Sequence, residues 1–443
     1  SDVCSSDLSP EVDMTTARVH GTGGVIDAVV HVPGSKSVAN RALMCAALVP
    51  NESISRVSNV PAGDDCVAML DALVHSGASD GTGERVTGGR FPGLADSFDA
   101  GIAGTTSRFL TAASALSAIG VVIDGGEPLR RRPMGDLHGA LRDLGVTVEQ
   151  VAGSLPGHLP VRVSGGRLEG GSVSVRGDVS SQFISALMLV APRTELGLEI
   201  DVVGDLVSRP YVEMTAHVMR EFGAKVDVDR ERIRVEPVPY RACDYRVEPD
   251  FSSAAFPVMS LAFSPGRVVL PGLGLAMNQG DSYVLEIARM LGLQVTHERD
   301  DVTVERATGS LLRAVNINLS DASDLVPAVA VACTAIAGRS SITGVGFIRA
   351  KESDRLGDLA HELNDAGGDV VVDEDGLTIH GGRAITPRRP LGTHHDHRLA
   401  MAFSLLAVGG AAVDIDEPNV VSKSWPTYFS DMADVLGPVD GLH

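Results

Sequence analysis

Basic and small polar residues recur at the starts of apolar segments, where a helix could bind an anion. They are Lys36, Ser37 and Arg41 in the first segment, Gly104, Thr105 and Arg108 in the second, Ser180, Ser181 and Gln182 in the third, Asp324 in the fifth, and His397 and Arg398 in the sixth. Further cations lie in loops at Arg132, Lys351, Arg355 and Lys423. A helix N-terminus offers unpaired N–H groups and about half a positive charge, and a neighbouring Arg or Lys adds charge-assisted hydrogen bonds. The set predicts a site for phosphate and carboxylate groups.

Two other motifs are weaker. Residues 34–37 resemble the end of a phosphate-binding P-loop, but the upstream position that requires glycine holds Val29. The histidine-rich stretch 394–397 could ligate a metal, yet no further cluster of ligands accompanies it. A polar helix start is therefore favoured over a metal site, and no metal is expected.

Two kinds of predicted helix alternate along the chain. Amphipathic segments end at Gly77, Gly145, Gly223, Gly292, Gly367 and Gly437, which are 68, 78, 69, 75 and 70 residues apart. More apolar segments start at Ser37, Thr106, Ser181, Ser252, Asp324 and Asp396, each with an N-cap type of residue. A period of about 72 residues, containing two helices and several strands, predicts six copies of one α/β unit. We expect three copies in each half, a change of half near residues 241–250, and an N-terminal strand at 17–32 that joins the second half.

Composition excludes some classes of protein. The 443 residues carry 37 Lys and Arg against 57 Asp and Glu, a formal net charge of -20, which disfavours a nucleic-acid or membrane-surface binder. The apolar runs are shorter than the roughly 18–20 residues of a membrane-spanning helix. The five cysteines are scattered, which favours a reducing cytoplasm over a disulfide framework.

Eight motifs carry a resemblance to a known family. They are PGSKSVANR, AGIAGTTSRFL, EPLRRRPMGDL, GDVSSQFISALM, GDLVSRPYVEM, AKESDRLGDLA, HHDHRLAMAFSL and VSKSWPTYF. Over residues 19–436 the chain resembles the 5-enolpyruvylshikimate-3-phosphate synthases (3-phosphoshikimate 1-carboxyvinyltransferases). The resemblance implies a two-domain inside-out α/β barrel of six βαβαββ repeats, with helix N-termini facing the interdomain cleft. It places a shikimate-phosphate-binding domain at 33–246, a second domain completing the phosphoenolpyruvate site at 17–32 plus 247–443, and a disordered or cloning-derived tail at 1–16.

The family joins phosphoenolpyruvate to the 5-hydroxyl of shikimate 3-phosphate and releases phosphate, so the resemblance also implies roles for individual residues. The implied contacts to shikimate 3-phosphate are Lys36, Ser37, Arg41, Ser180, Ser181, Gln182, Ser208, Tyr211, Asp324 and Lys351. Those to phosphoenolpyruvate are Lys36, Gly104, Thr105, Arg132, Gln182, Arg355, Arg398 and Lys423. Asp324 is the candidate base for the hydroxyl, and either Glu352 or Lys36 would exchange the proton on carbon. No cofactor is expected, and the protein is expected to be a monomer.

Two positions depart from the family pattern. Ile102 and Phe347 replace asparagines that many relatives carry, which removes possible hydrogen bonds to substrate.

The sister transferases that act on UDP-N-acetylglucosamine usually carry a reactive cysteine in the loop matching EPLRRRPMGDL, and this loop has none. RNA 3′-phosphate cyclases share related repeats but act on nucleic acid. A catalytically silent anion-binding protein would have no use for Asp324 and Glu352.

Overall fold

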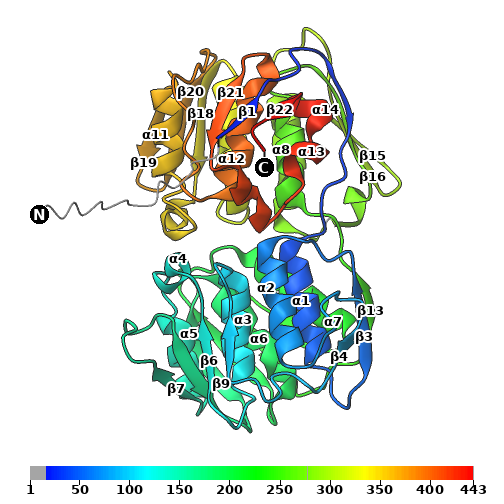
Figure 1. Cartoon of the computed structure of the whole chain (residues 1–443), viewed down its shortest axis with the longest axis vertical. Coiled ribbons are helices and arrows are strands. Elements are labelled where there is room, and N and C mark those ends of the chain that lie inside the picture. Colours follow the sequence, from blue (N-terminus) through cyan, green and yellow to red (C-terminus); the bar gives the residue numbers. More distant parts are fainter. Residues whose placement is uncertain (1–15, 277, 443) are drawn as a thin grey trace, which may run out of the picture.

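The computed structural model describes residues 16–276 and 278–442. Two lobes lie one above the other along the longest axis of the molecule (Figure 1). Residues 1–15, most of the predicted tail, lie outside the described residues, and Thr16 is the first residue of a strand rather than the last residue of the tail. Within the described residues no helix is long and apolar enough to cross a membrane.

Each lobe has its own apolar core. One core is built from residues between Val38 and Val247, and the other from residues between Val19 and Val32 together with residues between Phe251 and Leu436. The chain therefore crosses between the lobes near residues 33–37 and 248–250. The two crossings run side by side: the Ser35 amide donates to the carbonyl of residue 248 over 2.8 Å, and the amide of residue 250 donates to that of residue 33 over 2.9 Å.

Within the described residues each lobe has three sheets. In the first lobe they are, in spatial order, β13 (Asp244–Arg246), β3 (Ile54–Ser58) and β4 (Val86–Thr87); β5 (Ser97–Asp99), β6 (Val121–Asp124), β8 (Val161–Ser164) and β7 (Thr147–Gln150); and β9 (Gly171–Arg176), β10 (Leu198–Val203), β12 (Arg232–Val235) and β11 (Val226–Val228). In the second lobe they are β2 (Ile26–Val29), β14 (Gly266–Leu270), β16 (Asp301–Arg306) and β15 (Gln294–Glu298); β17 (Asn316–Asn318), β18 (Gly338–Thr343), β20 (Gly376–Gly381) and β19 (Val370–Asp373); and β21 (Val413–Asp416), β1 (Thr16–Val19) and β22 (Val439–Asp440).

The four-stranded sheets share one topology. In each, the first two strands in this order are parallel, and every later pairing is antiparallel. The α/β unit predicted from the period is thereby confirmed, with the βαβαββ order that the family resemblance implies. The expected single N-terminal strand is two strands, β1 and β2, which join different sheets of the second lobe.

The apolar helices occupy the centres of the lobes. They are α1 (Lys36–Ala47), α3 (Gly104–Ser114) and α6 (Ser181–Val190) in the first lobe, and α8 (Phe251–Ser260), α10 (Val326–Thr334) and α12 (His397–Ser404) in the second. Every residue of α10 is buried, as expected of a helix that is apolar on all sides. Helix α3 packs on α6, and α10 packs on both α8 and α12, so helices form the interior and sheets the exterior.

The amphipathic helices lie outside this central group. They are α2 (Asp64–His75), α5 (Gly135–Asp143), α7 (Arg209–Glu221), α9 (Val284–Leu291), α11 (Gly357–Asp365), and the short pair α13 (Tyr428–Asp431) and α14 (Ala433–Leu436); a further short helix, α4 (Glu127–Arg130), lies in a loop. The predicted glycines that follow them all have a positive φ, from 72° to 100°. Glycine tolerates this conformation without a steric cost, so it ends each helix cleanly.

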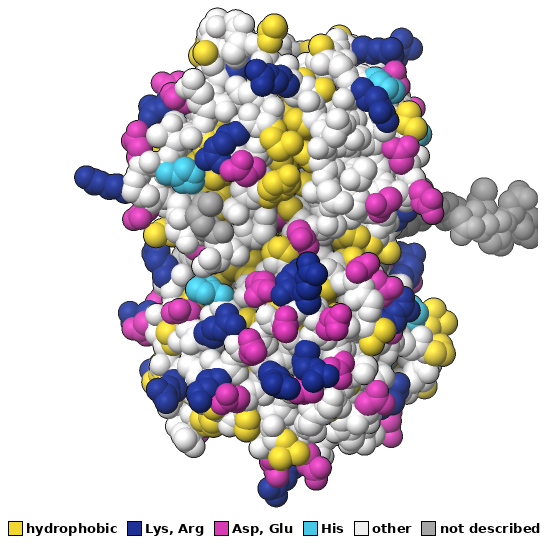
Figure 2. Space-filling view, turned by 180° about the vertical axis from the view of Figure 1, so that it is seen from behind, with side chains coloured by type: hydrophobic (Ala, Val, Ile, Leu, Met, Phe, Trp, Pro, Cys, Tyr) yellow, Lys and Arg dark blue, Asp and Glu magenta, His cyan; other side chains and the backbone are white. Residues whose placement is uncertain are grey.

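The outer faces of the sheets are charged. On β12, Ile233 and Val235 are buried while Arg232 and Arg234 alternate with them and are exposed. Both arginines pair with acidic residues of β10, over 2.7–3.1 Å. Figure 2 shows Lys and Arg interspersed with Asp and Glu on the face in view, which suits a solvated surface rather than a basic surface for nucleic acid.

Candidate active site

A cavity of about 370 Å³ lies between the lobes. From the first lobe it is lined by the predicted residues Lys36, Ser37, Arg41, Gly104, Thr105, Arg132, Ser180, Ser181, Gln182, Ser208 and Tyr211. From the second lobe it is lined by Asp324, Lys351, Glu352, Arg355 and Arg398. Lys423 does not line it but lies next to it, with its Nζ 3.2 Å from a carboxylate oxygen of Glu352. The structure thus brings the predicted residues to one place.

Several central helices begin at this cavity. The first residues of α1, α3, α6 and α12 are among its lining. Ser180 caps α6 and Asp396 caps α12 by accepting backbone N–H groups, whereas α1 and α3 have no side-chain cap. The prediction that all six openings carry capping residues is therefore wrong at α3, whose N-cap is Ala103, and at α10, whose N-cap is Leu325. At α1 the N-cap is Ser35, but its side chain accepts no backbone N–H. Uncapped N–H groups facing a cavity can bind an anion.

Gly104 allows two arginines to approach the start of α3. A Cβ at this position would lie 2.8 Å from an Nη1 atom of Arg108 and 2.8 Å from that of Arg132. Arg108 is buried and donates to the Gly104 carbonyl over 2.8 Å, and Arg132 lies 3.7 Å from Glu352 across the cavity. The absence of a side chain at position 104 leaves room for both guanidinium groups beside the free end of the helix.

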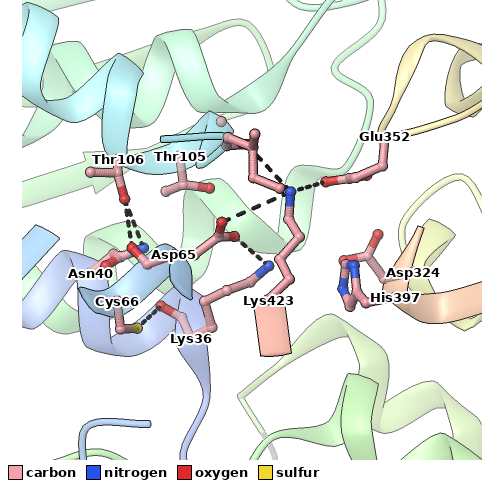
Figure 3. A network of polar contacts seen from close by, with 12 residues as sticks. Lys36, Asn40, Asp65, Cys66, Thr105, Thr106, Asp324, Glu352, His397 and Lys423 are labelled. Atoms are coloured by element: carbon pink, nitrogen blue, oxygen red, sulfur yellow. Dashed lines mark hydrogen bonds and ion pairs between the residues drawn. The ribbon is translucent and has the colours of Figure 1, made fainter. Parts of the chain in front are cut away.

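An ionic network joins the lobes at one side of the cavity (Figure 3). Lys36 Nζ lies 2.7 Å from Oδ2 of Asp65, the second residue of α2, and Lys423 Nζ lies 3.9 Å from the other oxygen. Lys423 also donates to the Ile102 carbonyl over 3.3 Å. Burial lowers the pKa of Lys36, but the Asp65 carboxylate more than offsets that effect and leaves it raised. Lys36 is therefore a protonated ammonium group at neutral pH.

Glu352 faces this network from the second lobe. Burial alone would raise the pKa of its carboxyl, but Lys423, Arg355 and Arg132 hold it well below its usual range. Arg355 Nη2 donates to it over 2.8 Å. Glu352 is therefore an ionised carboxylate, and in this arrangement it can accept a proton but not donate one.

Asp324 is a second ionised carboxylate. It lies in a 3₁₀ turn, η4 (Ser323–Leu325), ahead of α10, and accepts from Arg398 over 2.8 Å and from Arg355 over 3.1 Å. Burial would raise its pKa, but Arg398, Lys351 and Arg355 hold it well below its usual range. The Tyr211 hydroxyl lies 3.4 Å from its Oδ2. These ion pairs and hydrogen bonds hold the Asp324 carboxylate in one position.

Arg355 and Asp396 form a fully buried ion pair that supports the second-lobe wall of the cavity. Arg355 Nε donates to Asp396 Oδ2 over 2.8 Å, and the same carboxylate accepts the Arg398 backbone N–H over 2.9 Å. Asp396, the aspartate of the histidine-rich stretch, is thus a helix cap and an ion-pair partner. Within the described residues no group of three or more His, Cys, Asp and Glu is placed to hold a metal ion.

Arg41 is more deeply buried and makes more contacts within the protein than the sequence indicates. Its guanidinium donates to the Thr215 hydroxyl over 2.7 Å and to the Ser37 carbonyl over 2.7 Å, and it lies over the rings of Phe109 and Tyr211. Burial lowers its pKa to about 10, so it remains charged at neutral pH. It lines the cavity at its edge and also fixes the first-lobe wall.

Sequence reasoning missed two acidic residues of the site, Asp65 and Asp178, and underrated His397. Asp65 was not singled out, because an Asp in the first turn of an amphipathic helix is an ordinary feature. Asp178 also lines the cavity. His397 is buried there and, since burial and neighbouring Arg398 and Lys36 depress its pKa well below the usual range, it is neutral. At the departing positions, Phe347 lines the cavity, while Ile102 contributes its backbone carbonyl.

Comparison with known proteins identifies the family of the chain. The model of the family described as EPSP synthase (3-phosphoshikimate 1-carboxyvinyltransferase) matches residues 21–432. The chain belongs to the EPSP synthase family. It is 39% identical over 421 residues to the 3-phosphoshikimate 1-carboxyvinyltransferase of Methanothermobacter thermautotrophicus, covering 94% of this chain and 97% of that protein. It is 36% identical to the protein of the same name from Korarchaeum cryptofilum, covering 91% and 94%.

Solved structures confirm the two-lobed EPSP synthase fold. The EPSP synthase of Acinetobacter baumannii has a TM-score of 0.80 at 25% identity, covering 96% of this chain and 99% of that one. The enolpyruvyl transferase NikO of Streptomyces tendae has the same fold, with a TM-score of 0.72 at 17% identity over 96% and 98%. The resemblance drawn from the motifs is therefore confirmed for family and fold.

Proposed function

We propose that this chain transfers the enolpyruvyl (carboxyvinyl) group of phosphoenolpyruvate to the 5-hydroxyl of shikimate 3-phosphate, releasing phosphate in aromatic amino-acid biosynthesis. Family membership supports the reaction. The observation that supports this reaction in the cavity is that ionised carboxylates lie among cations of both lobes, next to helix N-termini that have no capping side chain. Two phosphates and a carboxylate need such a surface, and the reaction needs an acid and a base beside it.

The two substrates would occupy different parts of the cavity. Shikimate 3-phosphate fits the side formed by the start of α6 with Ser208 and Tyr211, together with Lys351 and Asp324 of the second lobe. Phosphoenolpyruvate fits the side formed by the uncapped start of α3, Arg132, Arg355, Arg398 and Lys423. Gln182 donates to Thr105 over 3.2 Å and so lies between the two sides. In this proposal residues 33–246 form the shikimate-phosphate-binding domain, and residues 17–32 with 247–443 form the domain that completes the phosphoenolpyruvate site.

The ionisation states assign the proton transfers. Asp324 takes the proton of the 5-hydroxyl group of shikimate 3-phosphate while the oxygen of that hydroxyl forms a bond to C2 of phosphoenolpyruvate. The protonated Lys36 donates to the C3 methylene, since ionised Glu352 has no proton to give. Neutral Lys36 then recovers a proton from the new methyl group while the C2–O bond to phosphate breaks, and the proton on Asp324 leaves with the phosphate. Glu352 holds Lys423 and Arg132 in place throughout.

The proposed function is tested by phosphate release from phosphoenolpyruvate in the presence of shikimate 3-phosphate, with UDP-N-acetylglucosamine in a parallel reaction. We expect phosphate release in the reaction that contains shikimate 3-phosphate and none in the reaction that contains UDP-N-acetylglucosamine. The release should persist in excess chelator. Phosphate release only in the reaction with UDP-N-acetylglucosamine would instead assign to the chain the activity of the sister transferases. Binding of phosphoenolpyruvate without release in either reaction would support a silent anion-binding protein.

We further propose that the protein works as a monomer in the cytoplasm. One chain supplies both walls of the cavity, so no second copy is needed to complete the site. Cys45, Cys66, Cys243 and Cys333 are free thiols, which suits a reducing compartment. Light scattering at micromolar concentration would test the oligomeric state.

A further inference from the structure

A third carboxyl group, Asp281, lies buried behind Tyr211. It belongs to the 3₁₀ turn η3 (Gly280–Tyr283) and is 4% exposed. Its Oδ2 accepts the Ser252 hydroxyl and lies 3.3 Å from the hydroxyl of Tyr211, while its Oδ1 has no hydrogen-bond partner. Among the described residues no Lys, Arg or His forms an ion pair with it, so its charge, unlike those of Asp324 and Glu352, has no counterion.

The fold holds this turn tightly from both sides. A Cβ at Gly280 would lie 2.5 Å from the Cβ of Pro210, so η3 presses on the first turn of α7, which carries Tyr211. Gln279 accepts from the Phe251 amide over 2.9 Å and donates to the carbonyl of residue 249 over 2.8 Å, which anchors η3 to the start of α8. The position of Asp281 is therefore built by contacts from both lobes.

The Tyr211 hydroxyl lies between two carboxyl groups, 3.3 Å from Asp281 and 3.4 Å from Asp324. A phenol has one proton, so it can donate to only one of them. Asp324 is surrounded by cations and ionised, which makes it the acceptor. Besides accepting from Ser252, Asp281 can then form a hydrogen bond with the phenol only by donating its own proton to the phenol oxygen.

We propose that Asp281 is a positioning residue for the base Asp324: it donates a proton to Tyr211 Oη and so directs the Tyr211 proton onto Asp324. The assignment rests on the proposed function for the role of Asp324 as base. It gives the Tyr211 hydroxyl one orientation instead of two, which leaves the remaining acceptor positions of Asp324 to its cations and to the substrate hydroxyl.

The charges around Asp281 support this arrangement. The groups that face it are Tyr211 of α7, Asp250 at the start of α8, Asp324 of η4 and Arg398 of α12, so carboxylates outnumber cations. Burial, with the negative charge of Asp324, raises its pKa to about 7. The protonated form predominates below that pH and is lost as pH rises through it. Above it, an added negative charge beside Asp324 would also repel the phosphate of the substrate.

Two substitutions separate positioning from mere packing. Asp281→Ala removes the donor, and we expect kcat to fall about tenfold, the loss typical of one hydrogen bond. Asp281→Asn can place its amide NH2 where Oδ2 lies, donating one N–H to Tyr211 and the other to the Ser252 hydroxyl, which rotates to accept it, so it should recover most of that loss and should abolish the decline in kcat near pH 7. Glu286→Gln, on the exposed side of the neighbouring α9, is the matched control. Equal losses in the Ala and Asn variants, or an unchanged decline near pH 7 in Asp281→Asn, would overturn the proposal.

A double-mutant cycle tests whether Asp281 acts through Tyr211. If it does, Asp281→Ala in a Tyr211→Phe background should cost no more than Tyr211→Phe alone, because interacting residues are not additive. Losses that multiply would show an independent role and overturn the assignment. Thermal melting of each variant checks that it is folded, and the Asn variant carries the test where the Ala variant is not.

Infrared spectroscopy gives a readout that needs no turnover. The wild-type protein should show the C=O band of a protonated carboxyl at pH 6 that is absent from Asp281→Asn and disappears as pH rises through about 7. Absence of this difference band would overturn the proposal. A protein with the band that releases no phosphate with shikimate 3-phosphate would contradict the proposed function, while supporting the hydrogen-bond arrangement.

Discussion

At the residue scale, proton transfer depends on which groups carry charge before substrate binds. Lys36 and Glu352 lie on opposite lobes and both contact the Asp65–Lys423 network, yet Lys36 carries an ammonium group, the proposed donor, and Glu352 an ionised carboxylate. The sequence alone left the choice between them open. It is their neighbours, Asp65 for Lys36 and three cations for Glu352, that distinguish them, and those neighbours are distant in sequence.

We predict that Lys36→Met abolishes turnover and leaves the fold intact. Methionine cannot donate a proton, and general acids typically contribute about 10²–10⁴-fold to rate. The measurement is phosphate release together with a melting curve. Lys225→Met, which removes an exposed lysine paired with Glu236 over 3.2 Å, is the matched control. A Lys36 variant that keeps more than about a tenth of wild-type activity would contradict the proposed acid role.

We also predict that Gly104→Ala weakens phosphoenolpyruvate binding more than it affects stability. The new Cβ would displace the ends of two flexible arginines, Arg108 and Arg132, which is cheap for the fold but moves the groups proposed to hold the substrate. KM for phosphoenolpyruvate should rise about tenfold, corresponding to about 1.4 kcal/mol, with little change in melting temperature. The control is Gly139→Ala in α5, where a Cβ meets nothing within 4 Å. An unchanged KM would show that Arg132 does not contact phosphoenolpyruvate.

At the scale of elements, the repeat period predicted the alternating helices and strands, because each unit buries its apolar helix in the same way. The residue types at the helix starts and the family resemblance predicted that those starts face one cavity. The expected capping residue is missing at α3, and Asp281, which lies behind Tyr211, belongs to a short 3₁₀ turn that has no periodic signal. The N-terminal segment joins the second lobe as expected, but as two strands, β1 and β2, which pair with strands of different sheets more than 200 residues away. Such pairings depend on tertiary contacts that a local pattern does not encode.

Helix α12 provides the prediction at this scale. Asp396→Ala removes both the cap of α12 and the 2.8 Å partner of buried Arg355, so we expect about 3 kcal/mol less stability, the low end for breaking a buried pair because Asp324 and Glu352 still contact that arginine. Urea unfolding measures it. Asp414→Ala, which removes an exposed 3.4 Å pair with Arg18, should cost at most about 1 kcal/mol. Similar losses for both variants would show that the buried pair is not the stabilising contact.

At the scale of the whole molecule, two lobes with separate cores are joined by a pair of adjacent crossings. Gly34 lies in the first crossing, where a Cβ would be 2.1 Å from the carbonyl oxygen of Asn59, so the crossings are closely packed on the first lobe. Across the cavity the lobes meet mainly through polar groups, including Arg132 with Glu352 at 3.7 Å and Ser422 with Asp64 at 2.7 Å. Lobes with such an interface can move about their crossings without exposing either core.

Anionic substrates should therefore draw the lobes together. The cavity contains more cations than carboxylates, so without bound anions the cations of the two lobes repel one another, and a substrate carrying phosphate replaces that repulsion with attraction to both walls. We predict that shikimate 3-phosphate lowers the radius of gyration measured by small-angle X-ray scattering, and that the effect weakens as salt shortens the screening length to about 8 Å at 0.15 M and below that at higher concentration. Sodium chloride at matched ionic strength is the control. Identical scattering curves with and without shikimate 3-phosphate would mean that the substrate binds to lobes already closed, and that closure does not contribute to its affinity.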